Sequence, residues 1–162
     1  MAGSRAVQRE VAASTAASGG PVSNALIRAT RLHMTRARQL FQSVGLHPGH
    51  ELLLMYLWDS GPCRQAELAA AFDTDSASMT RTVQRLERSG FVRRRPDPDD
   101  RRATLVESTP AGKALRSRVE QLWTELETDT VGGMSTAEQR RLLAGLERLG
   151  ANLTAGPDDT RR

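Results

Sequence analysis

Apolar residues recur at steps of three and four along most of the chain, which is the spacing of one face of an α-helix. Capping residues and glycines mark where each apolar stripe begins and ends. The stripe after Pro48 is apolar nearly all round, so its helix is predicted to lie at the buried centre of the fold. The predicted helices run from Ser23 to about Val44, from Pro48 to about residue 59, from Arg64 to Phe72, from Asp75 to about residue 89, from Thr109 to about residue 131 and from Ser135 to about residue 150.

A different pattern follows the fourth helix, where Gly90 ends the apolar stripe. A β-rich segment begins at residues 91–92, and Thr104–Val106 form a second one. Between them, Pro96–Asp100 are typical of a turn, because proline presets φ and aspartate favours turns. The order of elements predicts a mainly α fold: a winged helix-turn-helix with six helices, a two-stranded β-hairpin wing and a helical dimerisation region.

The fourth predicted helix combines an apolar face with a polar one. Met79, Val83 and Leu86 recur at helical spacing and should pack inward. Short polar side chains and arginines on the other face suit a helix that enters the major groove of DNA. A polar face is also ordinary for a helix in water, so the helix alone leaves both interpretations open. Its candidate DNA contacts are Arg81 and Gln84 for base edges, Ser76, Ser78 and Arg85 nearer the phosphates, and Thr80 beside them.

The predicted wing favours the DNA-binding interpretation. Eight arginines fall between residues 81 and 102, and they flank the tip of the hairpin on both sides. The acidic tip opposes DNA unless Asp97 or Asp100 pairs with a tip arginine and directs it into the narrow minor groove. A hairpin that only aids solubility is the weaker alternative, since helix and wing occur together. The candidate DNA contacts of the wing are Arg94, Asp100, Arg101 and Arg102.

The composition narrows the class of protein but does not indicate a function. The chain has 162 residues, enough for one domain with a core, and a formal net charge of +4. All but one of its 23 basic residues are arginine, an excess that arginine-rich codon usage explains in large part. Cys63 is the single cysteine, which excludes an intrachain disulfide and a cysteine-based zinc site. We find no signal peptide, no apolar run of membrane-spanning length and no enzyme motif. We therefore expect a cytoplasmic protein that is not an enzyme and has no cofactor, metal or membrane partner.

The apolar content of 38% is lean for a self-contained globule. Long apolar stripes lie near both ends of the chain, so a second subunit is expected to complete the core. The predicted organisation is a flexible N-terminal arm (1–22), a DNA-binding lobe (about 46–108), dimerisation helices (about 23–44 and 109–150) that join it in one unit (23–150), and a loose C-terminal tail (151–162).

Three segments resemble the MarR family of bacterial transcriptional regulators: RQAELAAAF, SMTRTVQRLERSGFVRRRPDPDDRRATLV and TPAG. The resemblance covers roughly residues 24–150. It implies a homodimer on a pseudo-palindromic double-stranded DNA site, with Thr80, Arg81 and Arg85 facing DNA and Arg102, braced by Asp100, in the minor groove. It also implies a repressor that a small aromatic or phenolic ligand releases from DNA. Ser108 departs from the apolar residue usual in the family, and we expect it to weaken the end of the hairpin.

The sequence is less specific about a sensor. An apolar cleft with histidine and arginine donors suits an aromatic carboxylate, although an ordinary packing role is the simpler interpretation of each histidine. The candidate ligand residues are His33, Arg38, His47, His50 and Trp58, with Tyr56 and Trp123 as further possibilities. Cys63 beside Arg64 offers an oxidant-sensing alternative, although a lone loop cysteine is more often incidental. A winged-helix protein-interaction module without DNA binding is the other alternative.

Overall fold

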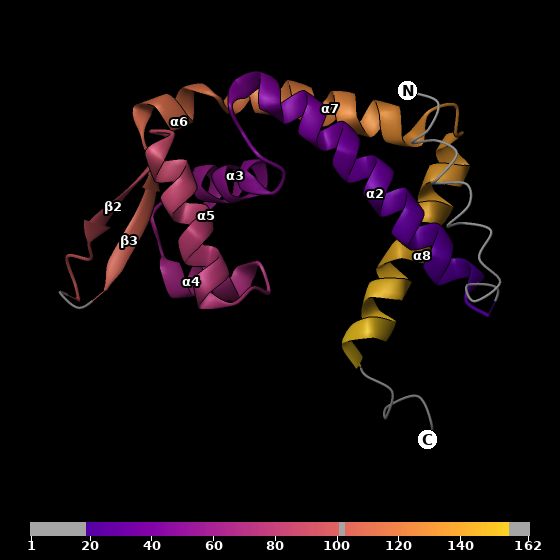
Figure 1. Cartoon of the computed structure of the whole chain (residues 1–162), viewed down its shortest axis with the longest axis horizontal. Coiled ribbons are helices and arrows are strands. Elements are labelled where there is room, and N and C mark those ends of the chain that lie inside the picture. Colours follow the sequence, from indigo (N-terminus) through magenta and orange to yellow (C-terminus); the bar gives the residue numbers. More distant parts are fainter. Residues whose placement is uncertain (1–18, 101–102, 156–162) are drawn as a thin grey trace, which may run out of the picture. The chain divides into compact units, whose positions relative to one another are not determined.

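A computed structural model describes residues 19–100 and 103–155, in which helices dominate (Figure 1). Two compact units divide the chain, one ending at Trp123 and the other beginning at Thr124. The predicted wing contacts Arg101 and Arg102 lie outside the described residues. The helices are α2 (Pro21–Phe41), η2 (Gln42–Val44, a 3-10 turn), α3 (His50–Ser60), α4 (Gln65–Ala71), α5 (Ser76–Arg88), α6 (Pro110–Ala114), α7 (Arg116–Val131) and α8 (Thr136–Ala155).

The first two helices begin at residues other than those predicted. Helix α2 starts at Pro21, because proline fits the first helical position, where no backbone N–H is needed. Ser23 is therefore inside the helix and does not cap it. Residues 21–22 of the predicted arm are helical, and residues 1–18 of it lie outside the described residues. Helix α3 starts at His50 rather than Pro48. Gly49 precedes it with a φ of +90°, a conformation that glycine adopts without strain, and this ends the turn that contains Pro48.

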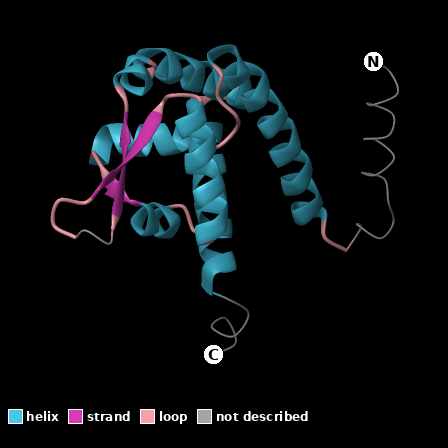
Figure 2. Ribbon diagram, turned by 60° about the vertical axis from the view of Figure 1, so that its left-hand side comes forward, coloured by secondary structure: helices cyan, strands magenta, loops and turns pink. Residues whose placement is uncertain are grey.

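The sheet has three antiparallel strands in the order β1-β3-β2, not the two that the sequence predicts (Figure 2). Strands β2 (Val92–Pro96) and β3 (Thr104–Ser108) form the predicted hairpin, with Val92 opposite Ser108. The added strand β1 (Cys63–Arg64) pairs with β3. A strand of two residues is too short to show an alternating pattern in the sequence. It forms only because β3 has an open edge with which it can pair.

The hairpin is paired up to Ser108, where the sequence predicted a weakened end. Strand β3 continues through Ser108, whose side chain is buried. Its hydroxyl oxygen accepts a hydrogen bond from the Trp58 indole N–H, with 3.3 Å between the heavy atoms. This bond supplies the partner that a buried hydroxyl requires, so the serine stabilises the junction between α3 and the sheet.

Helix α6 begins as predicted, with Thr109 as its N-cap and Pro110 in its first turn. The Thr109 hydroxyl oxygen accepts from the Gly112 backbone N–H at 3.0 Å. The predicted single helix is divided at Leu115 into α6 and α7, and α7 ends before Gly132, as predicted.

The core of the first unit lies between α2, α3, α5 and the sheet. As predicted, α5 buries Met79, Val83 and Leu86, and Asp75 caps it. Helix α3 is less enclosed than predicted, because Leu52 is 39% exposed. The largest fully buried side chains are Phe41, Leu46, Leu53, Leu54, Leu68, Leu86, Leu122, Val83, Val92, Val106 and Val119.

The second unit contains the end of α7 and helix α8. Ser135 and Glu138 form the predicted capping box: the Ser135 backbone N–H donates to the Glu138 carboxylate at 2.8 Å. Helix α8 continues to Ala155, so the predicted loose tail is helical over residues 151–155. No residue of α8 is buried, and its leucines lie on an exposed face. An exposed apolar face of this kind is typical of a surface that binds a partner.

Candidate nucleic-acid interface

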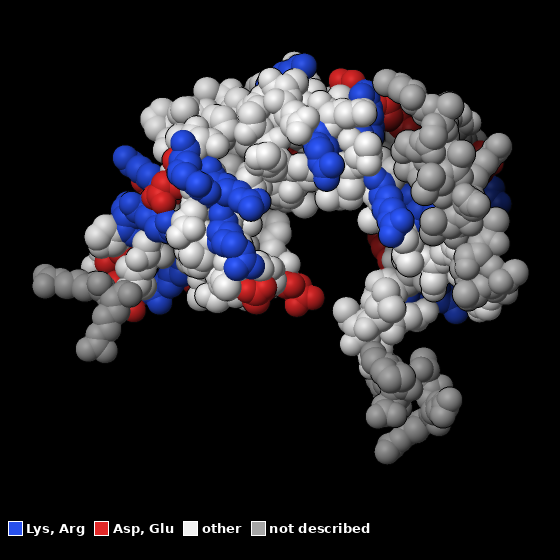
Figure 3. All heavy atoms as spheres, in the orientation of Figure 1, with Lys and Arg blue, Asp and Glu red and all other residues white. Residues whose placement is uncertain are grey.

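The outer face of α5 carries the predicted major-groove residues. Arg81, Gln84 and Arg85 are exposed and follow one another at helical spacing. Basic side chains gather over α5 and the neighbouring hairpin (Figure 3). These side chains have the reach and the donors for base edges and phosphates. Their contact with DNA stays a prediction.

The start of α5 is organised by Asp75. Its carboxylate accepts from the Ser78 backbone N–H at 2.8 Å and from the Ser78 hydroxyl at 2.6 Å. These hydrogen bonds hold the pKa of Asp75 below its usual range. Arg81 donates to the Ser78 hydroxyl oxygen at 2.7 Å. The Asp75 charge is therefore engaged in capping, which reduces its repulsion of a phosphate near the helix start.

Thr80 lies at the contact between α4 and α5. The Gln65 side-chain amide donates to the Thr80 hydroxyl oxygen at 2.7 Å, and that hydroxyl donates to the Ser76 carbonyl at 2.7 Å. Thr80 thus joins the two helices of the helix-turn-helix, a role that the sequence did not indicate. Its predicted place beside the DNA-facing residues is compatible with this role, because it is half-buried rather than enclosed.

The three consecutive arginines of β2 are paired within the chain. Arg93 and Arg95 both contact Glu107 of β3, at 2.6 and 2.9 Å. Together they hold the pKa of the Glu107 carboxyl below its usual range, Arg95 more than Arg93. Arg94 contacts Glu87 of α5 at 2.6 Å and donates to the Gln65 side chain at 3.3 Å. The DNA contact predicted for Arg94 would have to compete with this ion pair.

The acidic turn of the wing has a partner that the sequence did not reveal. Asp97, predicted to pair with a tip arginine, is bound by Arg64 at the junction of β1 and α4, at 2.7 Å. The two residues are 33 positions apart, so no local pattern relates them. Asp100 lies 4.0 Å from the same guanidinium. The predicted bracing of Arg102 by Asp100 falls outside the described residues.

The predicted ligand residues lie on separate elements of the fold. His33 and Arg38 lie on α2, half-buried and exposed respectively, and Trp58 lies near the end of α3. His47 and His50 lie side by side, with ring centroids 5.3 Å apart. Burial, with His47 and Arg85 nearby, lowers the pKa of His50 to about 4.

The neighbouring Glu51 was not singled out in the sequence. It is buried, one of its oxygens accepts from the Gly49 backbone N–H, and the other has no hydrogen-bond partner. Burial raises the pKa of this carboxyl.

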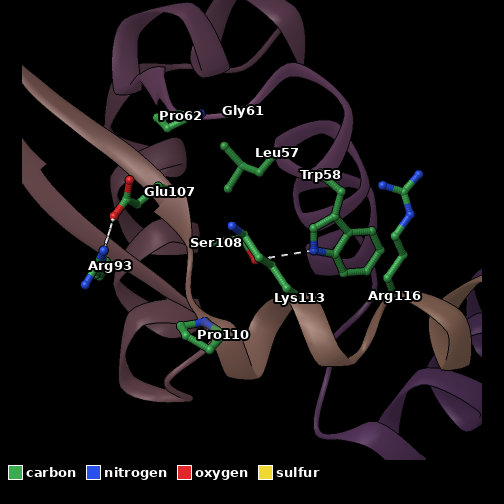
Figure 4. Close-up of a pocket in the computed structure, with 10 residues that line it drawn as sticks. All are labelled: Leu57, Trp58, Gly61, Pro62, Arg93, Glu107, Ser108, Pro110, Lys113 and Arg116. Carbon is green, nitrogen blue, oxygen red and sulfur yellow. Dashed lines mark hydrogen bonds and ion pairs between the residues drawn. The ribbon is translucent and has the colours of Figure 1, made fainter.

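Trp58 instead borders a hollow of about 440 Å³ between the end of α3, the base of the hairpin and α6 (Figure 4). Three cationic side chains line it, from β2, α6 and α7. The Arg116 guanidinium lies 6.0 Å from the centroid of the Trp58 ring. An aromatic wall with cations nearby suits a small planar anion. The lining residues are Leu57, Trp58, Gly61, Pro62, Arg93, Glu107, Ser108, Pro110, Lys113 and Arg116.

Cys63 is enclosed in strand β1. Its thiol is buried and donates to the Gly61 carbonyl at 3.3 Å. Burial raises the pKa of the thiol, and the nearby Glu67 raises it further. Both effects disfavour the thiolate, which is the form that oxidants attack.

Over residues 19–100 and 103–155, no three His, Cys, Asp or Glu side chains come together where a metal ion could be held. None of the helices in that part of the chain has both the length and the apolar character needed to cross a membrane.

Comparisons with known proteins agree with this architecture. The model of the MarR family matches residues 46–104. A putative transcriptional regulatory protein for the hcr operon of Thauera aromatica is 32% identical over 113 residues, which cover 70% of this chain and 68% of that protein. A MarR mutant from E. coli, solved with operator DNA, has the same fold, with a TM-score of 0.77 at 20% identity, covering 85% of this chain and 99% of that one.

A structure of Bordetella bronchiseptica BpsR has a TM-score of 0.71 at 27% identity, covering 80% of this chain and 98% of that one. DNA binding by BpsR is regulated by 6-hydroxynicotinic acid. The shared sequence and the shared winged-helix fold lead to one conclusion: the chain belongs to the MarR family of transcriptional regulators.

Proposed function

We propose that this chain is a sequence-specific regulator that binds double-stranded DNA as a homodimer and represses transcription until a small ligand releases it. The observation that carries the proposal is the exposed face of α5, where Arg81, Gln84 and Arg85 project beside a hairpin that the Arg94–Glu87 ion pair holds against the same helix. A helix and a hairpin in a fixed relation suit a major groove and the adjoining minor groove.

Arg81 and Gln84 are the proposed base-reading residues, and Ser76, Ser78, Thr80 and Arg85 the proposed neighbours of the phosphates. Arg101 and Arg102, which follow the acidic turn in the sequence, are the proposed minor-groove residues. This division predicts that substitutions impair DNA binding in two different ways. A base contact changes the preference among DNA sequences, whereas a phosphate contact weakens binding to all of them.

The proposed dimer rests on apolar side chains that are exposed in the part of the chain that the structure describes. Leu143 and Leu146 of α8 are 59% and 45% exposed. Helix α2 also exposes large apolar residues, among them Ile27 and Leu32. Two long helices with uncovered apolar residues support the predicted dimerisation region near the ends of the chain, and a two-fold dimer would present two α5 helices to successive major grooves.

The proposed effector is a small aromatic acid, and the hollow beside Trp58 is its proposed place. The hollow lies against the base of the wing, and one of its cations is Arg93, which pairs with Glu107 of the hairpin. An acid that competes for Arg93 would disturb this ion pair and so the position of the wing. BpsR, whose DNA binding 6-hydroxynicotinic acid regulates, makes this class of ligand the first to test.

The function is tested by fluorescence anisotropy with DNA from the gene's own upstream region against scrambled DNA, over a salt series. We expect selective binding whose logarithm falls with the logarithm of salt by roughly 0.9 for each phosphate contacted. Arg81→Ala should weaken operator binding by about 1–3 kcal/mol and reduce selectivity. If Arg81→Ala and Arg102→Ala both bind as tightly as the wild type, this mode of DNA docking is wrong.

The effector is tested in the same assay with 6-hydroxynicotinate and its neutral amide. We expect release by the acid only, and a loss of that release in Lys113→Gln, which removes a cation from the hollow. Arg118→Gln, on α7 but not among the residues that line the hollow, is the matched control. Release by hydrogen peroxide instead would favour the oxidant sensor, and salt-insensitive binding of a protein without DNA binding would favour the interaction module.

A further inference from the structure

The acidic turn of the wing contains a buried negative charge. Asp97 is only 5% exposed, although it lies in a surface hairpin that is rich in arginine. A buried carboxylate requires a cation or several hydrogen bonds. Asp97 has both: the Arg64 guanidinium, and the Asp99 backbone N–H, which donates to its other oxygen at 3.0 Å.

Arg64 connects three elements through separate groups. Its backbone pairs with Leu105 of β3, and its backbone N–H donates to Glu67 in the first turn of α4, at 2.9 Å. Its side chain extends away from β3 and α4 to the wing turn, where Nε donates to Asp97 Oδ2 at 2.8 Å. The side chain therefore fixes the end of β2 relative to the first helix of the helix-turn-helix.

Backbone hydrogen bonds beside Asp97 close the same turn. The Asp97 backbone N–H donates to the Ala103 carbonyl at 3.1 Å, and the Ala103 N–H donates to the Asp100 carbonyl at 2.9 Å. These bonds join the two sides of the turn next to Asp97. Holding Asp97 in place therefore holds both sides of this turn, and Arg101 and Arg102 lie between Asp100 and Ala103 in the sequence.

We propose that Arg64 and Asp97 are positioning residues for DNA binding: their ion pair sets the direction of the wing without touching DNA. The proposal rests on the DNA-binding function proposed above. It also accounts for an acidic residue in a DNA-binding hairpin, because the charge of Asp97 is directed inward and neutralised within the protein.

A substitution at Asp97 separates this role from simple electrostatics. Asp97→Asn removes a negative charge close to the proposed DNA surface, so charge alone predicts tighter binding. Positioning predicts the opposite, weaker operator binding by about tenfold, as expected when a hydrogen bond to a charged group is lost. Asparagine keeps an oxygen for the Asp99 N–H, so the variant tests the link to Arg64. Asp99→Asn, an exposed carboxylate in the same turn, is the matched control and should bind as tightly as the wild type or more tightly.

Arg64→Gln and the double variant complete the test. If Arg64 acts through Asp97, each single variant and the double variant lose a similar factor, and the salt dependence is unchanged. If Arg64 instead contacts a phosphate, Arg64→Gln lowers the salt slope by roughly 0.9 while Asp97→Asn does not weaken binding. That second result, or equal affinity in all variants, overturns the proposal.

A measurement without DNA keeps the test independent of the proposed function. Amide hydrogen exchange at Asp97 and Ala103 reports whether the turn opens in the free protein. We expect faster exchange at both amides in Arg64→Gln and Asp97→Asn and wild-type exchange in Asp99→Asn, measured at a temperature at which all three variants remain folded. Unchanged exchange in the first two variants shows that the ion pair does not hold the turn. Failure of the wild type to bind any DNA would end the proposed function but leave the exchange result interpretable.

Discussion

Gly112 lies so close to Phe91 that a Cβ atom on residue 112 would overlap the Phe91 carbonyl oxygen. That carbonyl also accepts from the Thr109 backbone N–H at 3.0 Å, and a Cβ on residue 112 would lie 2.6 Å from the Ser108 hydroxyl oxygen. The first turn of α6 thus packs directly against the start of β2, with no room for a side chain between them.

Gly112→Ala should therefore destabilise the fold. The methyl group must displace backbone rather than a flexible side chain, so we expect a loss of roughly 1–3 kcal/mol in the free energy of unfolding, measured by urea denaturation. Gly145→Ala in α8, where nothing lies within 4 Å, is the control. It should be neutral or stabilising by up to about 1 kcal/mol, because alanine favours a helix. A Gly112→Ala variant as stable as the wild type would show that this contact is not as close as described.

The uncovered leucines of α8 make the proposed dimer testable. Leu143→Glu places a charge on the apolar face, so we expect a shift from dimer to monomer in sedimentation equilibrium and weaker DNA binding. Arg148→Gln changes the charge of α8 by the same amount while leaving its leucines intact, and it should stay dimeric. A monomeric wild type, or a dimer that Leu143→Glu leaves unchanged, would contradict the assignment of this face.

His50 should make stability fall in mild acid. Its pKa in the folded protein, about 4, lies below the ordinary value of 6.5, so between these values the unfolded state binds the proton more readily. The contribution is present above about pH 6.5 and is lost as the pH falls towards 4. Glu51 acts oppositely: its raised pKa favours the folded state at low pH, and that contribution is lost as the pH rises above 4.5 through its folded pKa.

The His50→Gln variant isolates the first effect. Between about pH 7 and about pH 5, the wild type should lose on the order of 1 kcal/mol more stability than the variant. Urea denaturation at both pH values measures this loss of stability. Glu51→Gln should have the opposite effect and lose more stability than the wild type over the same pH interval. Identical pH profiles for wild type and His50→Gln would mean that His50 titrates normally in the fold.

Cys63 should react slowly with oxidants and with thiol reagents. Its thiol is enclosed by the strand and its pKa is raised by burial, so little thiolate forms at neutral pH. We expect a rate with a disulfide reagent at least an order of magnitude below that of the urea-unfolded chain, and equal DNA binding by the wild type and by Cys63→Ser both before and after peroxide. A fast native reaction would restore the oxidant-sensor alternative.

Local signals in the sequence were sufficient to predict α5 and the start of α8. Asp75, the spacing of Met79, Val83 and Leu86, and the Ser135–Glu138 pair all act within one or two turns of helix, so their effects appear as patterns. The winged-helix order followed from the same signals together with the turn after β2.

The contacts that organise the interface were not predictable in this way. Strand β1 exists only through its pairing with β3, and Arg64 meets Asp97 across 33 positions. The pairing of Arg94 with Glu87 likewise depends on where the hairpin folds back onto α5. An arginine in a basic run is identical in sequence whether it faces a nucleic acid or a carboxylate of its own chain, and tertiary structure decides between the two.

Substitutions on the two faces of α5 differ in their effect on the stability of the fold. Met79, Val83 and Leu86 are held by the core, whereas Gln84 and Arg85 extend into solvent. In the proposed docking, exchanging Gln84 alters the groups offered to a base pair at little cost to folding. The DNA sequence preferred by such a protein can therefore diverge during evolution one side chain at a time, on a scaffold that stays intact throughout.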